Sequence, residues 1–262
     1  MPTLLIDGVT LHYEERGRGL PVLLLHAFPL SGELFEPQLS ALGARFRLIV
    51  PDLRGFGRST GAGTVTEMER FAKDGFALLD ALGISAAVVG GVSMGGYAAM
   101  AMLREDPGRV KGLVLIDTQA APDDAGGQQR REENAKATLR DGMEFLVQSM
   151  VPRLLPDTAA PEVRAKVEAM IRRNQPEGAA AATRGMALRP DSKDILARYS
   201  GPALVVVGEK DAITPPEKAQ QMAELITGAT LVQVPGAGHL SNLERPEVVN
   251  RALEAFLAGI PA

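Results

Sequence analysis

Residues 86–95 read Ala-Ala-Val-Val-Gly-Gly-Val-Ser-Met-Gly, an apolar run that leads directly into the pattern G-x-S-x-G. An alanine-rich segment of helical character follows, so the serine stands where a strand turns into a helix. Such a turn strains the backbone of Ser93 and requires small residues two positions away, here Gly91 and Gly95. It also lifts the hydroxyl above the first N–H groups of the helix, where negative charge is stabilised. The stretch predicts a nucleophilic serine, although a glycine-rich turn that merely contains a serine has the same pattern.

Short apolar runs recur along the chain and alternate with segments of helical periodicity. Continuous runs of this kind are typical of parallel strands that are covered on both faces. The predicted strands are 9–14, 21–25, 47–50, 87–89, 112–116, 203–207 and 230–234. The predicted helices between them are 33–42, 65–82, 95–104, 216–226 and 246–257. The sequence therefore predicts a doubly wound α/β fold, with a mostly parallel central sheet flanked by helices.

The alternation stops between about Ala120 and Arg198, a stretch rich in Ala, Arg, Glu and Met that contains no convincing strand. The helices predicted there are 128–140, 143–151, 161–174 and 178–187, separated by prolines. We expect residues 1–119 and 199–262 to form the α/β core. Residues 120–198 are expected to form a helical cap over the site.

Composition excludes several classes of function. The chain of 262 residues has 28 Lys and Arg against 32 Asp and Glu, and no basic run, so we expect no nucleic-acid partner. No apolar stretch reaches the roughly 18 residues that a membrane span needs, and Asp7 and Gly8 come too early for the apolar core of a signal peptide. Cysteine is absent, which excludes disulfides and thiolate metal sites and is compatible with the cytoplasm, where we expect the protein. The sequence does not indicate an oligomer.

A serine nucleophile needs a neighbouring base, and only three histidines are present, His12, His26 and His239. His239 follows the predicted strand 230–234 in a glycine-rich loop, and such loops are where α/β sheets collect active-site residues. His12 belongs to the first predicted strand and is expected to be structural, whereas His26 is expected to brace the loop in which it lies. His239 is therefore the predicted base, against the alternative of a histidine that merely caps a turn.

The base must be oriented by an acid, and Asp211 is the best candidate because it follows a predicted strand. The chain order is then Ser93, Asp211, His239, which is nucleophile, acid and base. Asp117 is the alternative, because it directly follows an earlier strand and an acid there can also reach the base.

An oxyanion on the substrate needs two N–H donors. One is predicted to be the backbone N–H of Met94, the residue after the nucleophile, and the other that of Phe28, in the loop after the strand 21–25. No cluster of histidines and aspartates supports a metal site, and we expect neither a metal nor a cofactor.

Together these segments resemble the α/β-hydrolase superfamily over nearly the whole chain. The matching segments are His26-Ala27-Phe28-Pro29, Pro51-Asp52-Leu53-Arg54-Gly55-Phe56-Gly57-Arg58-Ser59, residues 91–96, and the segments around Asp211 and His239. The order of nucleophile, acid and base is also that of the superfamily. Within it, the chain is similar to capped esterases and lactonases, including the 3-oxoadipate enol-lactonase group, and to cofactor-free haloperoxidases. One departure is Ala27, where the superfamily usually has glycine, and its methyl group is expected to tune the fit of the acyl group.

The resemblance implies a serine hydrolase of small carboxylic esters or lactones that forms an acyl-enzyme on Ser93. The alternatives are a perhydrolase of the haloperoxidase type, a C–C bond hydrolase or lyase that uses the same serine, and a ligand-binding receptor on the same fold. Haloalkane dehalogenases and epoxide hydrolases resemble this fold but use aspartate as the nucleophile, so both are disfavoured.

The substrate pocket is expected to be lined by Phe28, Met94 and side chains of the cap. The candidates from the cap are Met143, Phe145, Leu146, Met150, Met170 and Met186. A methionine at helical spacing more often packs in a core, so these residues face either the pocket or the interior of the cap. Arg184 and Arg189 are weaker candidates for binding a substrate carboxylate, as an enol-lactone would require.

Overall fold

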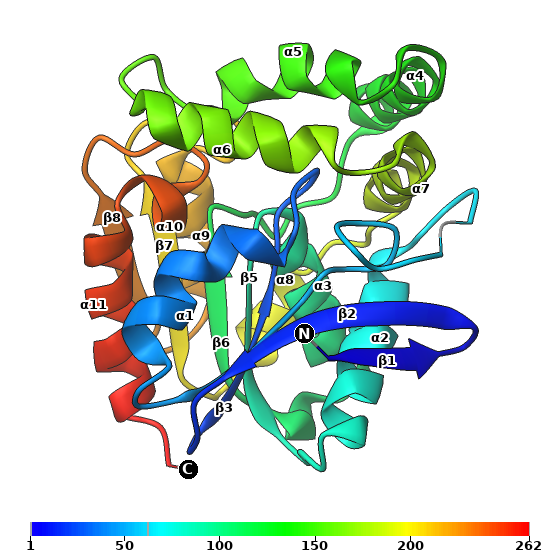
Figure 1. Ribbon diagram of the computed structural model, residues 1–262. Helices are drawn as coiled ribbons and strands as arrows, with labels where there is room; N and C mark the ends of the chain where they lie inside the picture. The colour runs from blue at the N-terminus through cyan, green and yellow to red at the C-terminus, as the bar shows by residue number, and fades with distance from the viewer. Residues whose placement is uncertain (1, 62, 262) are drawn as a thin grey trace.

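A computed structural model describes residues 2–61 and 63–261 of the chain, and its centre is one eight-stranded sheet (Figure 1). The strand order is β1-β2-β4-β3-β5-β6-β7-β8. The strands are β1 (Thr3–Ile6), β2 (Val9–Arg16), β3 (Pro21–Leu25), β4 (Arg47–Pro51), β5 (Ala87–Val92), β6 (Val110–Ile116), β7 (Ala203–Gly208) and β8 (Thr230–Val234). The β1–β2 and β2–β4 pairs are antiparallel, and every other pair is parallel. The predicted α/β fold with a mostly parallel sheet is confirmed.

The order of the strands reverses at β3, which lies between β4 and β5. Connections that leave a sheet in opposite directions open a crevice at the carboxyl ends of the strands, where α/β sheets bind ligands. Leu25, the last residue of β3, is the register partner of Gly91 near the end of β5. The fold therefore places the loop that follows β3 beside the turn at Ser93.

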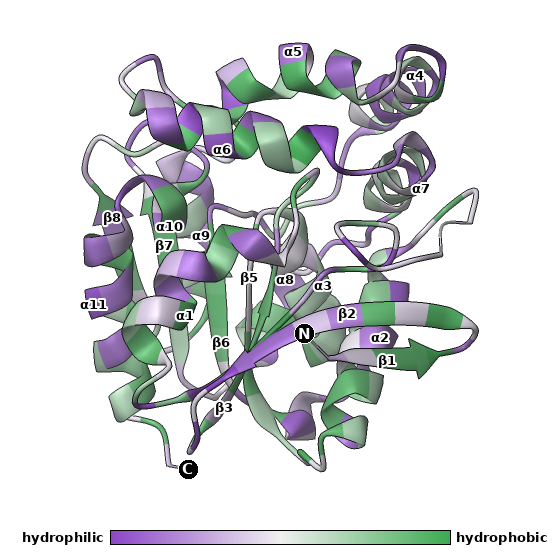
Figure 2. Ribbon diagram, in the orientation of Figure 1, coloured by the Kyte–Doolittle hydropathy of each residue, from purple (hydrophilic) through white to green (hydrophobic). Residues whose placement is uncertain are grey.

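Helices cover both faces of the sheet, with α1 and α11 on one face and α2, α3, α8 and α9 on the other (Figure 1). Their bounds are α1 (Glu36–Leu42), α2 (Met68–Ala81), α3 (Met94–Glu105), α8 (Lys193–Arg198), α9 (Pro216–Leu225) and α11 (Pro246–Ala258); the shorter η1 (Gly32–Phe35), η2 (Pro107–Arg109) and α10 (Ser241–Glu244) lie between them. Figure 2 shows that the central strands are predominantly hydrophobic, whereas α11 carries hydrophilic residues as well. Val249, Leu253 and Leu257 form the buried stripe of α11 at helical spacing, so burial of this stripe fixes the helix against the sheet.

Between β6 and β7 the chain forms α8 and a layer of four helices that lies above the carboxyl ends of the strands (Figure 1). These four, hereafter the cap helices, are α4 (Ala125–Asp141), α5 (Met143–Leu154), α6 (Pro161–Arg172) and α7 (Pro176–Ala187). In the layer, α4 packs against α7 and α5 against α6. The predicted limits of the cap, Ala120 and Arg198, enclose all four helices and also α8, which packs against α3 in the core.

Several elements differ from the prediction: α8 and α10 were not predicted, and the single helix predicted over 33–42 is η1 followed by α1. α5 continues through Pro152 to Leu154, whereas the sequence predicted its end at Val151. A proline in the last turn costs only one backbone hydrogen bond, so the helix can continue for two more residues. β1 was not predicted, because its apolar run is only three residues long, Leu4 to Ile6, and directly precedes the turn at Asp7 and Gly8.

Substitution of Gly95 is expected to destabilise the fold through a backbone clash. A Cβ at Gly95 would lie 1.9 Å from the carbonyl oxygen of Leu25 and 2.9 Å from that of His26, and neither atom belongs to a side chain that can rotate away. We expect Gly95→Ala to lower the free energy of unfolding by about 3 kcal/mol, measured by urea denaturation. Gly259→Ala is the control, because its Cβ would lie 3.5 Å from the nearest atom, an ordinary contact. Equal stability of the two variants would contradict this view of the turn.

Candidate active site

Ser93 occupies the turn between β5 and α3 in a strained conformation, with φ of 53° and ψ of −112°. Its N–H donates to the carbonyl oxygen of Ile116 at 2.9 Å, and its own carbonyl accepts from Thr118 Oγ1 at 2.8 Å. A Cβ at Gly91 would lie 2.2 Å from the carbonyl carbon of Gly95, so both glycines are needed. The predicted turn is thus present, and the neighbouring strand β6 and the residue Thr118 hold it in place.

The three residues predicted from separate segments form one chain of hydrogen bonds. His239 Nε2 lies 2.7 Å from Ser93 Oγ, and His239 Nδ1 lies 2.8 Å and 2.9 Å from the two carboxylate oxygens of Asp211. His239 and Asp211 are buried, whereas Ser93 is half-buried. Since the carboxylate accepts the proton on Nδ1, the neutral imidazole leaves Nε2 free to accept the Ser93 proton. The arrangement can therefore move a proton from the hydroxyl to the imidazole.

Asp211 is fixed by donors from its own loop. The N–H groups of Ile213 and Thr214 donate to Oδ1 at 2.8 Å and 2.9 Å, and Thr214 Oγ1 donates to Oδ2 at 2.7 Å. Burial on its own would raise the pKa of Asp211. The hydrogen bond and charge of His239, together with the bonds from Thr214, outweigh burial, so the pKa is lowered. Asp211 is therefore a carboxylate at neutral pH.

Asp117, the alternative acid, makes different contacts. Its Oδ1 accepts from the N–H of Gly208 at 2.8 Å, and its Oδ2 accepts from the N–H and the hydroxyl of Ser241 at 2.8 Å and 2.7 Å. Burial, and then the negative charge of Asp211, raise its pKa to about 7. Asp117 thus joins the end of β7 to the segment after His239, while Asp211 is the carboxylate that contacts the imidazole.

The two predicted N–H donors lie beside the serine turn. Met94 is the first residue of α3, and N–H groups at a helix start have no acceptor within the helix. Phe28 lies in the loop after β3, and its N–H has no acceptor among the described residues. His26 braces this loop as predicted, because its Nδ1 contacts the carbonyl oxygen of Ala27 and its Nε2 accepts from the N–H of Leu53, each at 2.9 Å. Burial lowers the pKa of His26, so the imidazole is neutral.

Asn174, in the link between α6 and α7, ties the cap to the same loop and was not predicted from the sequence. Its buried side chain donates to the carbonyl oxygens of Pro29 at 2.7 Å and Leu30 at 3.2 Å. Its Oδ1 accepts from the N–H of Gly57 at 2.6 Å. The sequence predicted Asn174 as the last residue of a helix over 161–174, whereas α6 ends at Arg172, so only the packing of the cap on the core reveals this contact.

A cavity of about 380 Å³ lies between the cap helices and the core, next to Phe28. Its lining residues from the core include Phe28, Tyr97, Gln119 and Ile213. Those from the cap include Arg130, Arg131 and Asn134 of α4, and Leu146, Ser149, Met150 and Arg153 of α5. The cap contacts His239 directly, because the N–H of His239 donates to the carbonyl oxygen of Leu154 at 3.0 Å. The volume falls within the range of about 300–1,000 Å³ that is typical of small-molecule sites.

The expected pocket residues divide into two groups. Phe28, Leu146 and Met150 line this cavity. The others do not line it: Met94, Met143, Met170 and Met186 are buried in the hydrophobic core, and Phe145 packs against that core. Their apolar side chains fill the interior of the cap and the base of α3, and polar residues of α4 take the place that the methionines were expected to occupy.

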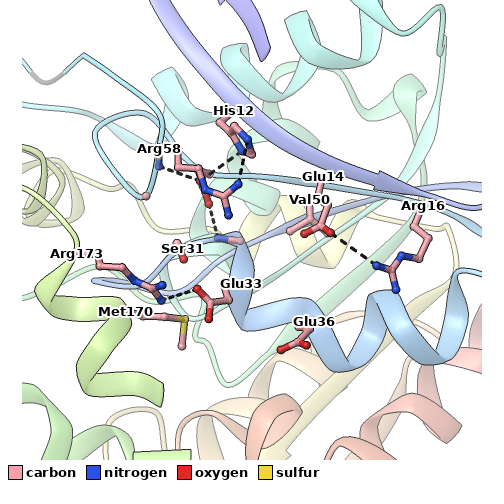
Figure 3. Close-up of a pocket in the computed structure, with 13 residues that line it drawn as sticks. His12, Glu14, Arg16, Ser31, Glu33, Glu36, Val50, Arg58, Met170 and Arg173 are labelled. Atoms are coloured by element: carbon pink, nitrogen blue, oxygen red, sulfur yellow. Dashed lines mark hydrogen bonds and ion pairs between the residues drawn. The ribbon is translucent and has the colours of Figure 1, made fainter. Parts of the chain in front are cut away.

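A second cavity of about 400 Å³ lies between β2, η1 and α6 (Figure 3). Ser93, Asp211 and His239 line neither cavity, but only the first is lined by Phe28 and Ile213, which belong to the loops of the site. Its charged groups are of both signs and contact one another: Arg173 and Glu33 are 2.5 Å apart, and Arg16 and Glu14 are 3.8 Å apart. This mixture of charges does not favour a ligand of one sign.

The residues 2–61 and 63–261 contain no group of three or more His, Cys, Asp or Glu side chains that could hold a metal ion. In the same part of the chain, no helix is both long and apolar enough to cross a membrane.

Comparisons with known proteins identify the family of the chain. A family model described as alpha/beta hydrolase fold matches residues 21–246. The AB hydrolase superfamily protein YisY of Bacillus subtilis is 31% identical over 259 residues, which are 95% of this chain and 96% of that protein. A thermophilic esterase from Thermogutta terrifontis, solved with malate bound, is 43% identical with a TM-score of 0.95, over 99% of this chain and 97% of the other. The enol-lactonase from Burkholderia xenovorans LB400 is 27% identical with a TM-score of 0.89, over 98% and 100% of the two chains.

The match to the family model runs from β3 to the start of α11 and so includes the turn at Ser93 and the segments of Asp211 and His239. These residues also carried the resemblance seen in the sequence. The chain therefore belongs to the α/β-hydrolase fold family.

Proposed function

We propose that this chain is a serine hydrolase of small carboxylic esters or lactones. The observation that carries the proposal is the continuous chain of hydrogen bonds from Ser93 through His239 to Asp211. A cavity of the size of a small molecule is lined by Phe28 and Ile213, from the two loops that contribute to the site. The likeness to an esterase and to an enol-lactonase supports the same class of reaction.

In the first half of the proposed reaction, Ser93 Oγ attacks the carbonyl carbon of the ester while His239 Nε2 takes the hydroxyl proton. The imidazolium that forms is stabilised by the Asp211 carboxylate on its other nitrogen. The negative charge that develops on the carbonyl oxygen is stabilised by the N–H groups of Phe28 and Met94. His239 then gives its proton to the leaving alcohol, and the acyl group remains on Ser93.

In the second half, water replaces the alcohol. His239 takes a proton from the water, whose oxygen attacks the acyl carbon, and the tetrahedral intermediate collapses to release the carboxylic acid and regenerate the Ser93 hydroxyl. In a lactone the alcohol and the acid belong to the same molecule, so one ring-opened product leaves.

Replacement of the nucleophile is expected to abolish both turnover and covalent labelling. Ser93→Ala should lower kcat for p-nitrophenyl acetate by a factor on the order of 10⁴–10⁶ and prevent labelling by a fluorophosphonate probe, because no other group can form the acyl adduct. Ser31→Ala is the matched control, since Ser31 is also poorly exposed but lines the second cavity (Figure 3). Labelling of the Ser93→Ala protein would disprove the role of Ser93. A wild-type protein that binds but does not hydrolyse esters would instead indicate a receptor.

Activity is expected to fall toward acid pH, because a protonated His239 imidazole cannot accept the Ser93 proton. The lowered pKa of Asp211 keeps that carboxylate charged over the same range, so within the chain of Ser93, His239 and Asp211 only the imidazole is expected to gain a proton. A plot of log kcat/KM against pH should therefore approach a slope of about 1 on the acid side. Melting curves at each pH check that the protein remains folded. A flat profile in the folded range would contradict the role of His239.

Asp117 is proposed to act on the site only by positioning, because it holds Gly208 and Ser241 and does not contact the imidazole. Its titration should appear in the stability of the fold. Its pKa is about 7 in the folded chain against an ordinary value of 3.8, so the folded state binds the extra proton between these values. The stability that comes from this group is thus complete below about pH 4 and is lost as the pH rises through about 7.

We therefore expect the free energy of unfolding to fall more between pH 5 and pH 8 in the wild type than in Asp117→Asn, which cannot titrate. Urea denaturation at the two pH values measures the difference. Glu244, whose pKa burial also raises, titrates in both proteins, and so the comparison isolates Asp117. An identical pH dependence in the two proteins would show that Asp117 is ionised throughout.

A further inference from the structure

The cap contributes one face of α4 and one face of α5 to the cavity beside Phe28, and these two faces are hereafter called the roof of the cavity. On α4, Gly127, Arg130, Arg131 and Asn134 line the cavity at the spacing i, i+3, i+4 and i+7, which marks a single helix face. On α5, Leu146, Ser149, Met150 and Arg153 line it at the same spacing. The α4 face contains no apolar side chain, so it is poorly suited to a hydrocarbon acyl group.

The charges of this roof are positive. Three arginines and one carboxylate, Asp123, line the cavity, in a chain whose net charge is −4. Asp123 already accepts from two arginines, Arg131 and the buried Arg189, the latter at 2.8 Å. Burial would raise the pKa of Asp123, but these arginine contacts outweigh it and lower the pKa. Both carboxylate oxygens of Asp123 are therefore already paired, one with Arg131 and the other with Arg189.

Arg130 and Arg153 are different, because within the described part of the chain neither makes an ion pair or a side-chain hydrogen bond. Both residues are exposed, and both line the cavity. Arg153 also directly precedes Leu154, whose carbonyl oxygen accepts from the N–H of His239. Arg153 therefore belongs to the turn of α5 whose backbone contacts His239.

The two arginines that the sequence suggested for a carboxylate have other partners. Arg184 pairs with Glu132 at 2.8 Å. Arg189 lies over the ring of Tyr97, 4.3 Å from its centroid, and donates to Asp123 and to the carbonyl oxygen of Met186. Both are occupied in holding the cap to the core.

We infer that the ester or lactone hydrolysed at Ser93 carries a second group, a carboxylate, that Arg130 and Arg153 bind. The inference rests on the function proposed above. A guanidinium matches the two oxygens of a carboxylate and forms charge-assisted hydrogen bonds with it. The scissile carbonyl then lies at the Phe28 end of the cavity and the carboxylate lies under α4 and α5.

The test compares substrates that differ only in the charged group. On the acyl side these are monomethyl glutarate and methyl valerate, in which a methyl group replaces the carboxylate. On the alcohol side they are carboxymethyl butyrate and ethyl butyrate. We expect the wild type to have a kcat/KM about 10-fold or more higher for the charged member of one pair, which identifies the side that carries the carboxylate.

In the double variant Arg130→Ala/Arg153→Ala, this ratio should fall by about 10-fold or more. The control is Arg140→Ala/Arg198→Ala, which removes the same charge from exposed arginines that pair with Asp141 and Asp194 and do not line the cavity. It should keep the wild-type ratio. Hydrolysis of neutral esters with no preference for charge, or an unchanged ratio in the double variant, would overturn the inference and leave the proposed function intact.

A binding measurement that requires no turnover tests the carboxylate site separately from the proposed hydrolase activity. Titration calorimetry of glutarate into Ser93→Ala, with and without the two arginine substitutions, reports the carboxylate site even if the wild type hydrolyses none of the esters. Affinity about 10-fold weaker without the arginines supports the site. Equal affinity would overturn it.

Discussion

The contact between Gly95 and the end of β3 is the constraint on which the site depends. The carbonyl oxygens of Leu25 and His26 lie so close to Gly95 that no side chain fits between them. As a result, the loop after β3, which contains Phe28, begins against the start of α3, whose first residue is Met94. This arrangement requires a strained backbone conformation at Ser93, and the hydrogen bonds of Ser93 with Ile116 and Thr118 hold the residue in it.

Two buried carboxylates near His239 show how environment separates their roles. Asp211 receives the imidazole and three donors from its own loop, which keep it charged. Asp117 is buried more deeply and feels the charge of Asp211, which favours its neutral form. From the sequence both follow a strand and both could serve as the acid. The hydrogen bonds of the folded chain distinguish a partner of the base from a residue that joins two loops.

Ser93, Asp211 and His239 could be predicted from the sequence because each stands just after a strand, and a parallel sheet brings the carboxyl ends of its strands to one edge. The strands and most helices were predictable for a similar reason, since each is encoded in one contiguous segment. Asn174 and Thr118 could not be predicted, because their roles arise from contacts between distant segments. The lining of the cavity depends on how α4 and α5 are rotated about their axes, and Met143 and Met186 turned out to pack in the core instead.

The bond between His239 and the cap involves backbone atoms on both sides: an N–H from the loop and the carbonyl oxygen of Leu154. The N–H groups of Phe28 and Met94 are backbone groups too. Side chains on the cavity face of the cap can therefore be exchanged without altering the backbone atoms that join the cap to His239. In such a molecule α4 and α5 can change which small molecules the cavity accepts, while the arrangement of Ser93, His239 and Asp211 is preserved.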